Sequence, residues 1–292
     1  MRSIGMIGIG MMGHGIATNL LRHGYPLMVL EHPGNQPLDK LLGAGATSTP
    51  DLKALVARAE VLLLCVTGSP QIEALMLGDQ GIAATMKRGT IVIDCSTAIP
   101  SSTVRVAKAV ANAGGRFLDA PMTRTPREAA LGKLNLIVGG DKDLFEACLP
   151  ILQSFAENIV HGGGVGAGHQ LKLLHNFVSL GFSAILAETV ACAVKGGVDP
   201  KVLMEILAKG AGGGVVFERI RPYVDAGDAS GLQFAMVNGL KDVTYYNDMA
   251  REQGAAHAAA ETIRGIYADA AKADPQQPIP TLIDFLAGTP RK

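Results

Sequence analysis

The first half of the chain alternates short apolar runs with longer helical stretches. Apolar runs bounded by turn-forming residues predict strands. We expect these strands at residues 3–8, 26–31, 61–66, 91–95, 116–119 and 134–139. Helical patterns lie between several of them, for example at residues 13–23, 51–59 and 101–113. This alternation predicts a mostly parallel sheet with helices on both faces.

The second half has a different pattern. A glycine-rich segment at residues 162–168 ends the alternation, and no strand is predicted beyond it. Helical patterns then follow one another at residues 169–196, 200–208, 239–253 and 257–272. We therefore predict an α/β domain over residues 1–164 and an all-α domain over residues 165–292, joined by a long interdomain helix.

A glycine-rich turn follows the first predicted strand and reads Gly-Ile-Gly-Met-Met-Gly at residues 8–13. The first glycine allows a tight turn, the second lets a pyrophosphate approach the backbone, and the third allows close packing of the next helix. Because this turn lies between a strand and a helix, we predict a Rossmann-type, dinucleotide-binding domain. The expected contacts to the dinucleotide come from Gly8, Gly10, Met11, Met12 and Gly13.

An acidic residue ends the second predicted strand. Glu31 lies 18 residues after Gly13, close to the roughly 20 expected of a carboxylate that binds the ribose hydroxyls. This carboxylate would repel a 2′-phosphate, and His32 and Pro33 follow it in place of an arginine. We therefore predict NAD in preference to NADP. The alternative is that Glu31 is only an exposed charge at the end of a strand.

Composition narrows the class of protein. With 292 residues, 48% hydrophobic and 18% charged, the chain can form two domains with substantial cores. The formal net charge is zero, without a basic stripe, which argues against nucleic acid or a membrane surface as a partner. The four cysteines form no C-x-x-C pair, so we expect buried, reduced thiols. The seven histidines form no cluster with carboxylates, and we expect no metal.

Two apolar segments could be mistaken for membrane or export signals. The N-terminal run carries the glycines of a nucleotide-binding turn and no convincing cleavage site. Residues 177–194 are long and apolar, but they contain Glu188 and several small polar side chains. We expect a buried interdomain helix in a soluble, cytoplasmic protein.

Four polar residues mark one face of the long predicted helix. Lys172, His175, Asn176 and Ser179 have the spacing i, i+3, i+4 and i+7. Unpaired buried polar groups are costly, so such a stripe on an apolar helix requires polar partners or a water-accessible pocket. The alternative is a solvent-facing stripe in which Lys172 extends into water.

Five motifs occur in the order typical of one enzyme family. They lie at residues 8–13, 94–100, 119–125, 166–176 and 234–242. Together they resemble the β-hydroxyacid dehydrogenases of the 3-hydroxyisobutyrate dehydrogenase type, over essentially the whole chain.

The resemblance implies roles for individual residues. Lys172 would be the base toward the substrate hydroxyl in oxidation and the acid toward the carbonyl in reduction, with Asn176 orienting the lysine or the substrate. Contacts to the coenzyme are implied or expected for Val66, Thr67, Thr97, Phe234 and Lys241, and a contact to the substrate for Ser96. Alternative roles are a helix N-cap for Ser96 and Thr97, and a surface charge for Lys241.

Departures from the family pattern point to the substrate. Most members have Ser-Gly-Gly where this chain has Thr123-Arg124-Thr125, and asparagine in place of His175. A guanidinium group suits an oxyanion. The branch resembling sulfolactaldehyde reductase, a short-chain semialdehyde reductase, also has arginine and threonine here and a serine matching Ser179, but asparagine where this chain has His175. We expect Thr123, Arg124, His175 and Ser179 to bind a small anionic substrate; the alternative for Arg124 is a solvent-facing loop charge.

The predicted activity is NAD-dependent interconversion of a small 3-hydroxy acid, or an anionic analogue such as a sulfonate, and its aldehyde or ketone. Family members are commonly homodimers or homotetramers, and we expect the same here. An imine reductase-like NAD(P)H enzyme is one alternative, although those relatives usually carry another residue where Lys172 stands. A non-catalytic regulator that binds the cofactor is the other.

Overall fold

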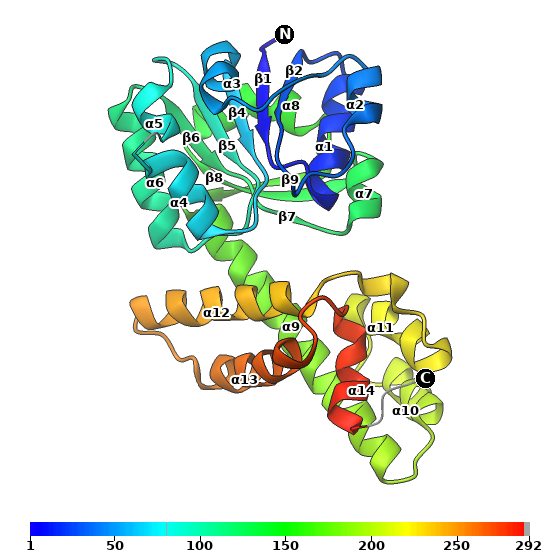
Figure 1. The fold of residues 1–292 in the computed structure, drawn as a ribbon. Coiled ribbons are helices and arrows are strands. Elements are labelled where there is room, and N and C mark those ends of the chain that lie inside the picture. The colour runs from blue at the N-terminus through cyan, green and yellow to red at the C-terminus, as the bar shows by residue number, and fades with distance from the viewer. Residues whose placement is uncertain (80, 289–292) are drawn as a thin grey trace. The chain divides into compact units, whose positions relative to one another are not determined.

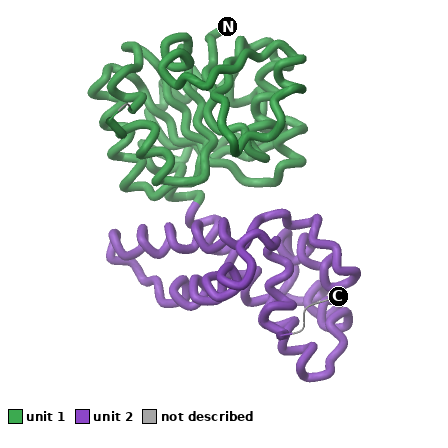
Figure 2. The backbone as a smooth tube through the Cα atoms, viewed as in Figure 1, with its two compact units in different colours: residues 1–172 green, residues 173–292 purple. Residues whose placement is uncertain are grey.

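The computed structural model describes residues 1–79 and 81–288. The chain divides into two compact units, residues 1–172 and 173–292 (Figure 2). This division falls eight residues after the boundary expected at 164/165, because the first turns of the long helix belong to the first unit.

Unit 1 is built on a nine-stranded sheet (Figure 1). The strand order is β3-β2-β1-β4-β5-β6-β8-β7, and β9 pairs with β8. Only the contacts of β8 with β6 and β7 are antiparallel. The strands are β1 Ile4–Ile7, β2 Leu27–Leu30, β3 Thr47–Thr49, β4 Val61–Leu64, β5 Ile91–Asp94, β6 Arg116–Asp119, β7 Met122–Thr123, β8 Leu134–Gly140 and β9 Ala156–Gly163.

All six predicted strands are confirmed, whereas β3, β7 and β9 were not predicted. β3 and β7 are only three and two residues long. β9 has only the short apolar pair Ile159 and Val160, and Glu157, Asn158 and Val160 are exposed, so it lacks the continuous apolar run of a buried strand. These three strands exist because β2 and β8 offer free edges for pairing.

Helices cover both faces of this sheet, as predicted (Figure 1). Ile4 and Met6 of β1 belong to one apolar core, which also holds side chains of α1, α2, α7 and α8, whereas Ile7 belongs to the other, with side chains of α3 to α6. Alternate residues of a strand point to opposite faces, so one short apolar run supplies both cores. The helices are α1 Met11–Arg22, α2 Asp39–Gly43, α3 Leu52–Arg58, α4 Ser69–Leu77, α5 Ile82–Thr85, α6 Pro100–Asn112, α7 Pro126–Ala130 and α8 Lys142–Leu152.

Unit 2 is helical throughout its described residues. Its core gathers apolar side chains from every helix, with Phe217 and Tyr267 among the fully buried ones. α11 was not predicted: Pro222 lies inside it and a glycine run precedes it. The elements are α9 Ala167–Lys195, which begins in unit 1, α10 Pro200–Lys209, α11 Val215–Ala226, η1 Ala229–Leu232, α12 Met236–Glu252, α13 Ala258–Ala273, η2 Ile279–Thr281 and α14 Leu282–Ala287.

α9 is the one helix of the described residues that is long and apolar enough to cross a membrane, judged by length and composition. Its Leu180, Ala184 and Val190 belong to the core of unit 2, and its Lys172 and Asn176 are buried polar residues. These buried side chains fit the core helix of a soluble protein. The helix is only partly buried, however, because Val178 and Ile185 on it are exposed.

The four cysteines are all free thiols. Cys95 and Cys148 are buried and Cys65 partly so, but Cys192 on α9 is exposed, and the expectation of a buried thiol is wrong there. Burial, with a smaller contribution from the nearby Asp94 carboxylate, raises the pKa of Cys65 to about 12. Burial also raises the pKa of Cys95 well above its ordinary value, so neither group forms the reactive thiolate at neutral pH.

The glycines of the turn between β1 and α1 have separable roles. Gly8 has φ +95°, and a Cβ atom there would lie 2.2 Å from the carbonyl oxygen of Cys65. A Cβ atom at Gly13 would lie 2.0 Å from the carbonyl oxygen of Gly8. At Gly10, in contrast, no atom of the described residues comes within 4 Å of such a Cβ. The fold therefore requires Gly8 and Gly13, whereas Gly10 leaves space for a ligand.

A pair of alanine substitutions separates these roles. Gly13→Ala should lower the melting temperature by more than about 4 °C, because its Cβ meets backbone that cannot move aside. Gly10→Ala should leave the melting temperature unchanged and weaken NADH binding at least roughly tenfold, because its Cβ would occupy the path of the pyrophosphate. Thermal melts and NADH fluorescence titrations measure both effects. Unaltered NADH affinity in Gly10→Ala would remove the turn from the coenzyme site.

Candidate active site

Three segments of unit 1 meet at one edge of the sheet. Gly8 follows β1, Val66 and Thr67 follow β4, and Ser96 and Thr97 follow β5, and these three strands are neighbours and parallel. Ligands of such sheets bind outside the carboxyl ends of the strands. Thr67 is exposed and Thr97 partly exposed, so both predicted coenzyme residues are open to a ligand.

Ser96 joins two of these segments and is itself buried. Its Oγ accepts a hydrogen bond from the Val66 N–H at 3.0 Å, and its own N–H donates to Oδ1 of Asp94 at 2.9 Å. Burial raises the pKa of Asp94 above its ordinary value. Ser96 is not a helix cap: α6 begins after Ile99, whose side chain makes no capping bond.

The start of α1 is open toward this edge. Its N-cap is Gly10, and none of the described side chains accepts from its first amides. Uncapped amides at a helix N-terminus suit a phosphate group. Met11 is exposed in this first turn, and Met12 packs against the core. These residues fit a dinucleotide pyrophosphate.

Glu31 directly follows β2, and its carboxylate is held in place. Its Oε1 accepts a hydrogen bond from the Ser48 hydroxyl of β3 at 2.6 Å. The loop after it is tied to the glycine turn, since Oδ1 of Asn35 accepts from the Ile9 N–H at 3.2 Å and the Gln36 N–H donates to the Ile9 carbonyl at 2.7 Å. Glu31 is thus a positioned carboxylate, although it remains exposed.

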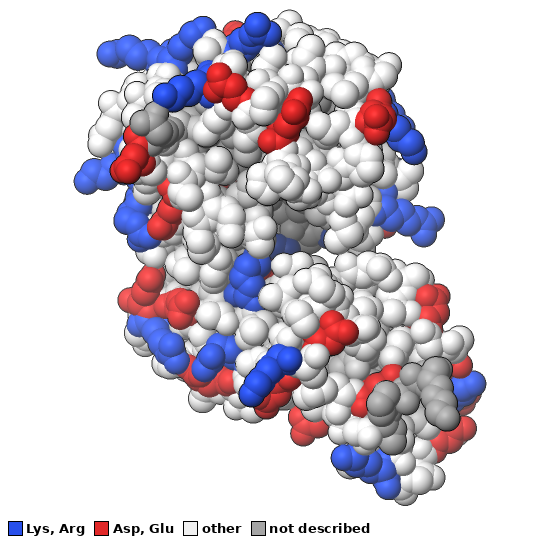
Figure 3. All heavy atoms as spheres, viewed as in Figure 1, with Lys and Arg blue, Asp and Glu red and all other residues white. Residues whose placement is uncertain are grey.

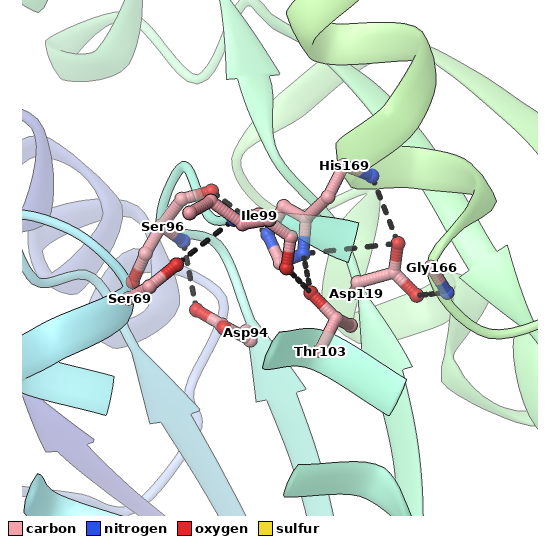
Figure 4. A network of polar contacts seen from close by, with 8 residues as sticks. All are labelled: Ser69, Asp94, Ser96, Ile99, Thr103, Asp119, Gly166 and His169. Atoms are coloured by element: carbon pink, nitrogen blue, oxygen red, sulfur yellow. Dashed lines mark hydrogen bonds and ion pairs between the residues drawn. The ribbon is translucent and has the colours of Figure 1, made fainter. Parts of the chain in front are cut away.

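A buried polar network connects this edge with the first turn of α9 (Figure 4). Asp119, at the end of β6, accepts hydrogen bonds from the N–H groups of Gly166 and His169. The His169 ring contacts Oγ1 of Thr103 and the carbonyl oxygen of Ser96. Asp119 and His169 were not predicted as site residues, although both stand inside the motifs at 119–125 and 166–176.

Lys172 is the last residue of unit 1 and lies in the second turn of α9. Its side chain is nine-tenths buried, and Asn176, one turn later, is 6% exposed. The alternative of a solvent-facing polar stripe is therefore wrong for both. His175 is exposed and Ser179 half-buried, so the predicted stripe divides into a buried and an accessible part.

Unit 2 holds its own polar cluster around Asp242, a residue of α12 that is 2% exposed. Nδ2 of Asn176 donates to Oδ2 of Asp242 at 2.6 Å, and Nζ of Lys241 lies 2.8 Å from Oδ1. Nδ1 of His175 lies 3.0 Å from Oδ1 of Asn176. Lys241 also lies over the Tyr245 ring, so it is an engaged cation and not an isolated surface charge. Asp242 was missed as a site residue, although it follows Lys241 directly.

Phe234 lies apart from these contacts of Asp242. It precedes α12 and packs, partly buried, against the core of unit 2.

Arg124 is engaged within unit 1. Its Nη1 donates to Oε2 of Glu157 at 2.6 Å and to the Lys133 carbonyl at 2.5 Å. The guanidinium holds the pKa of Glu157 below its ordinary value through this hydrogen bond. Arg124 is the one non-glycine residue of the described chain with positive φ, at +82°. Oγ1 of the neighbouring Thr123 accepts from Nδ2 of Asn135. Arg124 is therefore a partly exposed charge that is engaged by partners in its own unit.

Neither the surface charge nor the arrangement of metal-ligating side chains indicates a further site. On the face drawn in Figure 3, Lys and Arg lie among Asp and Glu over each unit. Within residues 1–79 and 81–288, His, Cys, Asp and Glu form no group of three or more that could hold a metal ion.

Two protein families match the chain, one for each part. Residues 3–163 match the NAD-binding domain of 6-phosphogluconate dehydrogenase, and residues 166–278 match the NAD-binding domain of NADP-dependent 3-hydroxyisobutyrate dehydrogenase. The NAD-dependent L-serine dehydrogenase of Pseudomonas aeruginosa is 32% identical over 262 residues, 90% of this chain and 88% of that protein. The 3-hydroxyisobutyrate dehydrogenase of the same organism is 32% identical over 246 residues, 82% of each chain.

Solved structures share the fold. The Mycobacterium tuberculosis 3-hydroxyisobutyrate dehydrogenase, solved with L-serine, has a TM-score of 0.87 at 23% identity over 98% of this chain and 99% of that one. An imine reductase from Pseudomonas sp. is more distant, with a TM-score of 0.59 at 19% identity over 97% and 98%. With matches over both units and relatives 32% identical along most of their length, the chain belongs to the β-hydroxyacid dehydrogenase family of NAD(P)-dependent oxidoreductases.

Proposed function

We propose that this protein is an NAD-dependent dehydrogenase that interconverts a small 3-hydroxy acid, or an analogue with another anion, and its aldehyde or ketone. The observation that carries the proposal is the buried Lys172 on α9, in the same unit as the glycine turn. Two relatives are named as dehydrogenases of L-serine and of 3-hydroxyisobutyrate, which supports the substrate class.

In oxidation, the neutral amine of Lys172 accepts the proton of the substrate hydroxyl while the carbon loses its hydrogen with the bonding electrons. In reduction, the ammonium group returns a proton to the carbonyl oxygen. A bound nicotinamide supplies the acceptor or donor of the hydride. Burial keeps the amine away from competing water and strengthens its interaction with the substrate oxygen.

Asn176 has an orienting role in this proposal. Because its Nδ2 donates to Asp242, its amide plane is fixed, and its Oδ1 faces away from that carboxylate and lies 3.0 Å from Nδ1 of His175. A fixed amide oxygen one helical turn from Lys172 can orient the amine or the substrate hydroxyl.

Replacing the lysine tests the proposal directly. Lys172→Ala should lower kcat at least about 100-fold, the usual loss for a general acid–base, and leave NADH affinity unchanged. Lys195→Ala, at the exposed C-terminal end of the same helix, is the matched control and should keep full activity. The assay follows NADH absorbance with carboxylate, sulfonate and phosphate versions of one short hydroxy compound. Normal turnover in Lys172→Ala would reject the assignment, and no turnover by the parent would favour a regulator.

The preference for NAD is proposed from Glu31 and Ser48. The Ser48 hydroxyl directs the carboxylate, which can accept hydrogen bonds from both ribose hydroxyls of NAD and would repel the 2′-phosphate of NADP.

Glu31→Ala should reduce the ratio of kcat/KM for NAD to that for NADP at least roughly tenfold, because the charge repulsion disappears. Ser48→Ala should reduce the ratio less, since it only orients the carboxylate. Initial rates with each coenzyme give the ratios. A parent enzyme that prefers NADP, or a ratio untouched by Glu31→Ala, would contradict the proposed preference.

We also propose that Arg124, with the neighbouring Thr123, binds the anionic group of the substrate. The positive φ of Arg124 is a strained backbone state, and such strain is concentrated at functional positions. Its present partner Glu157 is an exposed carboxylate, which a substrate anion could replace.

Substitutions of Arg124 and of Glu157 should change the KM for the substrate in opposite directions. Arg124→Gly relieves the backbone strain and should raise the KM for the substrate at least about tenfold, with the KM for NADH unchanged. Glu157→Gln should lower the substrate KM, because the guanidinium loses its competing partner. Steady-state kinetics measure both values. If both variants raised the substrate KM together, or Arg124→Gly raised both KM values equally, the pair would be a structural link only.

Two further expectations remain proposals. A homodimer or homotetramer is supported by apolar side chains exposed on the helices of unit 2, among them Val178, Ile185, Ile206 and Val215. A cytoplasmic location is supported by free cysteines and by α9 as a core helix.

A further inference from the structure

The first turn of α9 is capped by a carboxylate from a distant part of the chain. Asp119 is fully buried, and its Oδ1 accepts from the Gly166 N–H at 2.8 Å and its Oδ2 from the His169 N–H at 2.9 Å. The first amides of a helix need acceptors, and a carboxylate is favourable at this end of the helix dipole. Because Asp119 ends β6, these bonds fix the start of α9 to the sheet.

Two glycines make room for this carboxylate. A Cβ atom at Gly139 would lie 2.7 Å from both carboxylate oxygens of Asp119. A Cβ atom at Gly168 would lie 2.8 Å from Oδ2 of Asp119 and 2.5 Å from the carbonyl oxygen of Ile137. Directional bonds and close backbone packing therefore set the position of α9 together, and any larger residue would displace the helix.

His169 fastens the same turn to a second place. The ring is fully buried, with Nε2 3.2 Å from the Ser96 carbonyl and Nδ1 2.7 Å from Oγ1 of Thr103 (Figure 4). A carbonyl oxygen only accepts, so Nε2 carries a proton. Asp119 Oδ2 lies 4.0 Å from Nδ1. The imidazole thus joins α9 to α6 and to the segment that carries Ser96.

We propose that Asp119 and His169 are positioning residues for Lys172. They fix the position of α9 along its axis and its rotation against the edge of the sheet. They thereby fix the position of the Lys172 amine, three residues after His169. A displacement of about 1 Å in a reacting group can cost about 100-fold in rate. The inference rests on the proposed role of Lys172.

Other carboxylate caps in the chain provide controls. Asp51 caps α3 by accepting from the Lys53 N–H at 2.8 Å, but α3 carries none of the proposed site residues. Gly43 in α2 has open space around its Cβ position among the described atoms. Asp51→Asn and Gly43→Ala therefore repeat the carboxylate-to-amide change of Asp119→Asn and the glycine-to-alanine change of Gly168→Ala at places away from α9.

Kinetics of these variants test the positioning role. Asp119→Asn leaves an amide where two N–H donors need acceptors, and kcat should fall at least about tenfold while NADH affinity stays within about twofold. The deuterium isotope effect with NADD should rise, because the chemical step becomes limiting. Gly168→Ala and His169→Gln should also lower kcat, and Thr103→Val should lower it less strongly. The two control variants should leave kcat unchanged. If Asp119→Asn does not fold, Thr103→Val carries the test.

A double-mutant cycle separates positioning from a general structural role. In the Lys172→Ala background, Asp119→Asn, or Thr103→Val in its place, should lower the residual kcat by less than about twofold, because its effect acts through the missing amine. An equal loss in both backgrounds would overturn the inference. The inference would also be overturned if the loss of activity were fully explained by a lower melting temperature or by weaker NADH binding. Normal turnover in Lys172→Ala would instead refute the proposed function. If Lys172→Ala is slow but Asp119→Asn, or Thr103→Val in its place, is fully active, only the positioning role is refuted.

Discussion

The carboxylate of Asp119 joins the sheet of unit 1 to the start of α9. It lies at the end of β6, in a space that only glycines at 139 and 168 provide, and it accepts from the N–H of Gly166, just before α9, and from the N–H of His169 in the first turn of α9. A buried charge is tolerated only where such partners satisfy it. The sheet that forms the coenzyme edge and the helix that carries Lys172 therefore share one rigid attachment.

The edge of the sheet at the carboxyl ends of β1, β4 and β5, where the coenzyme is expected, is shaped more by the backbone than by side chains. Gly8 and Gly13 are required by contacts within the fold, whereas Gly10 is open. The amides at the start of α1 are uncapped, and the loop after Glu31 is bonded to Ile9. Side-chain chemistry enters through Glu31, which Ser48 directs, and through Ser96, whose hydroxyl holds the neighbouring segment in place.

Engaged charges recur in both units. Asp242 binds Asn176 and Lys241, and Arg124 binds Glu157. The first group is buried, so its geometry is stiff, and it can set the orientation of an amide. The second is more exposed, and screening by water makes such a pair weak and exchangeable. One arrangement suits permanent alignment of a site, and the other suits competition with an anionic ligand.

Local periodicity was enough to determine the six main strands, the long helix, the glycine turn and the face shared by Lys172 and Asn176, because each is encoded in residues close together in the chain. The edge strands β3 and β9 escaped this pattern, since pairing with a neighbour and not an apolar run makes them strands. Asp119, Arg124 and Asp242 each have a partner far along the chain, respectively Gly166, Glu157 and Asn176, which lie 47, 33 and 66 residues away. Only tertiary folding brings such groups together, and it also decided that Lys172 is buried while His175 faces solvent.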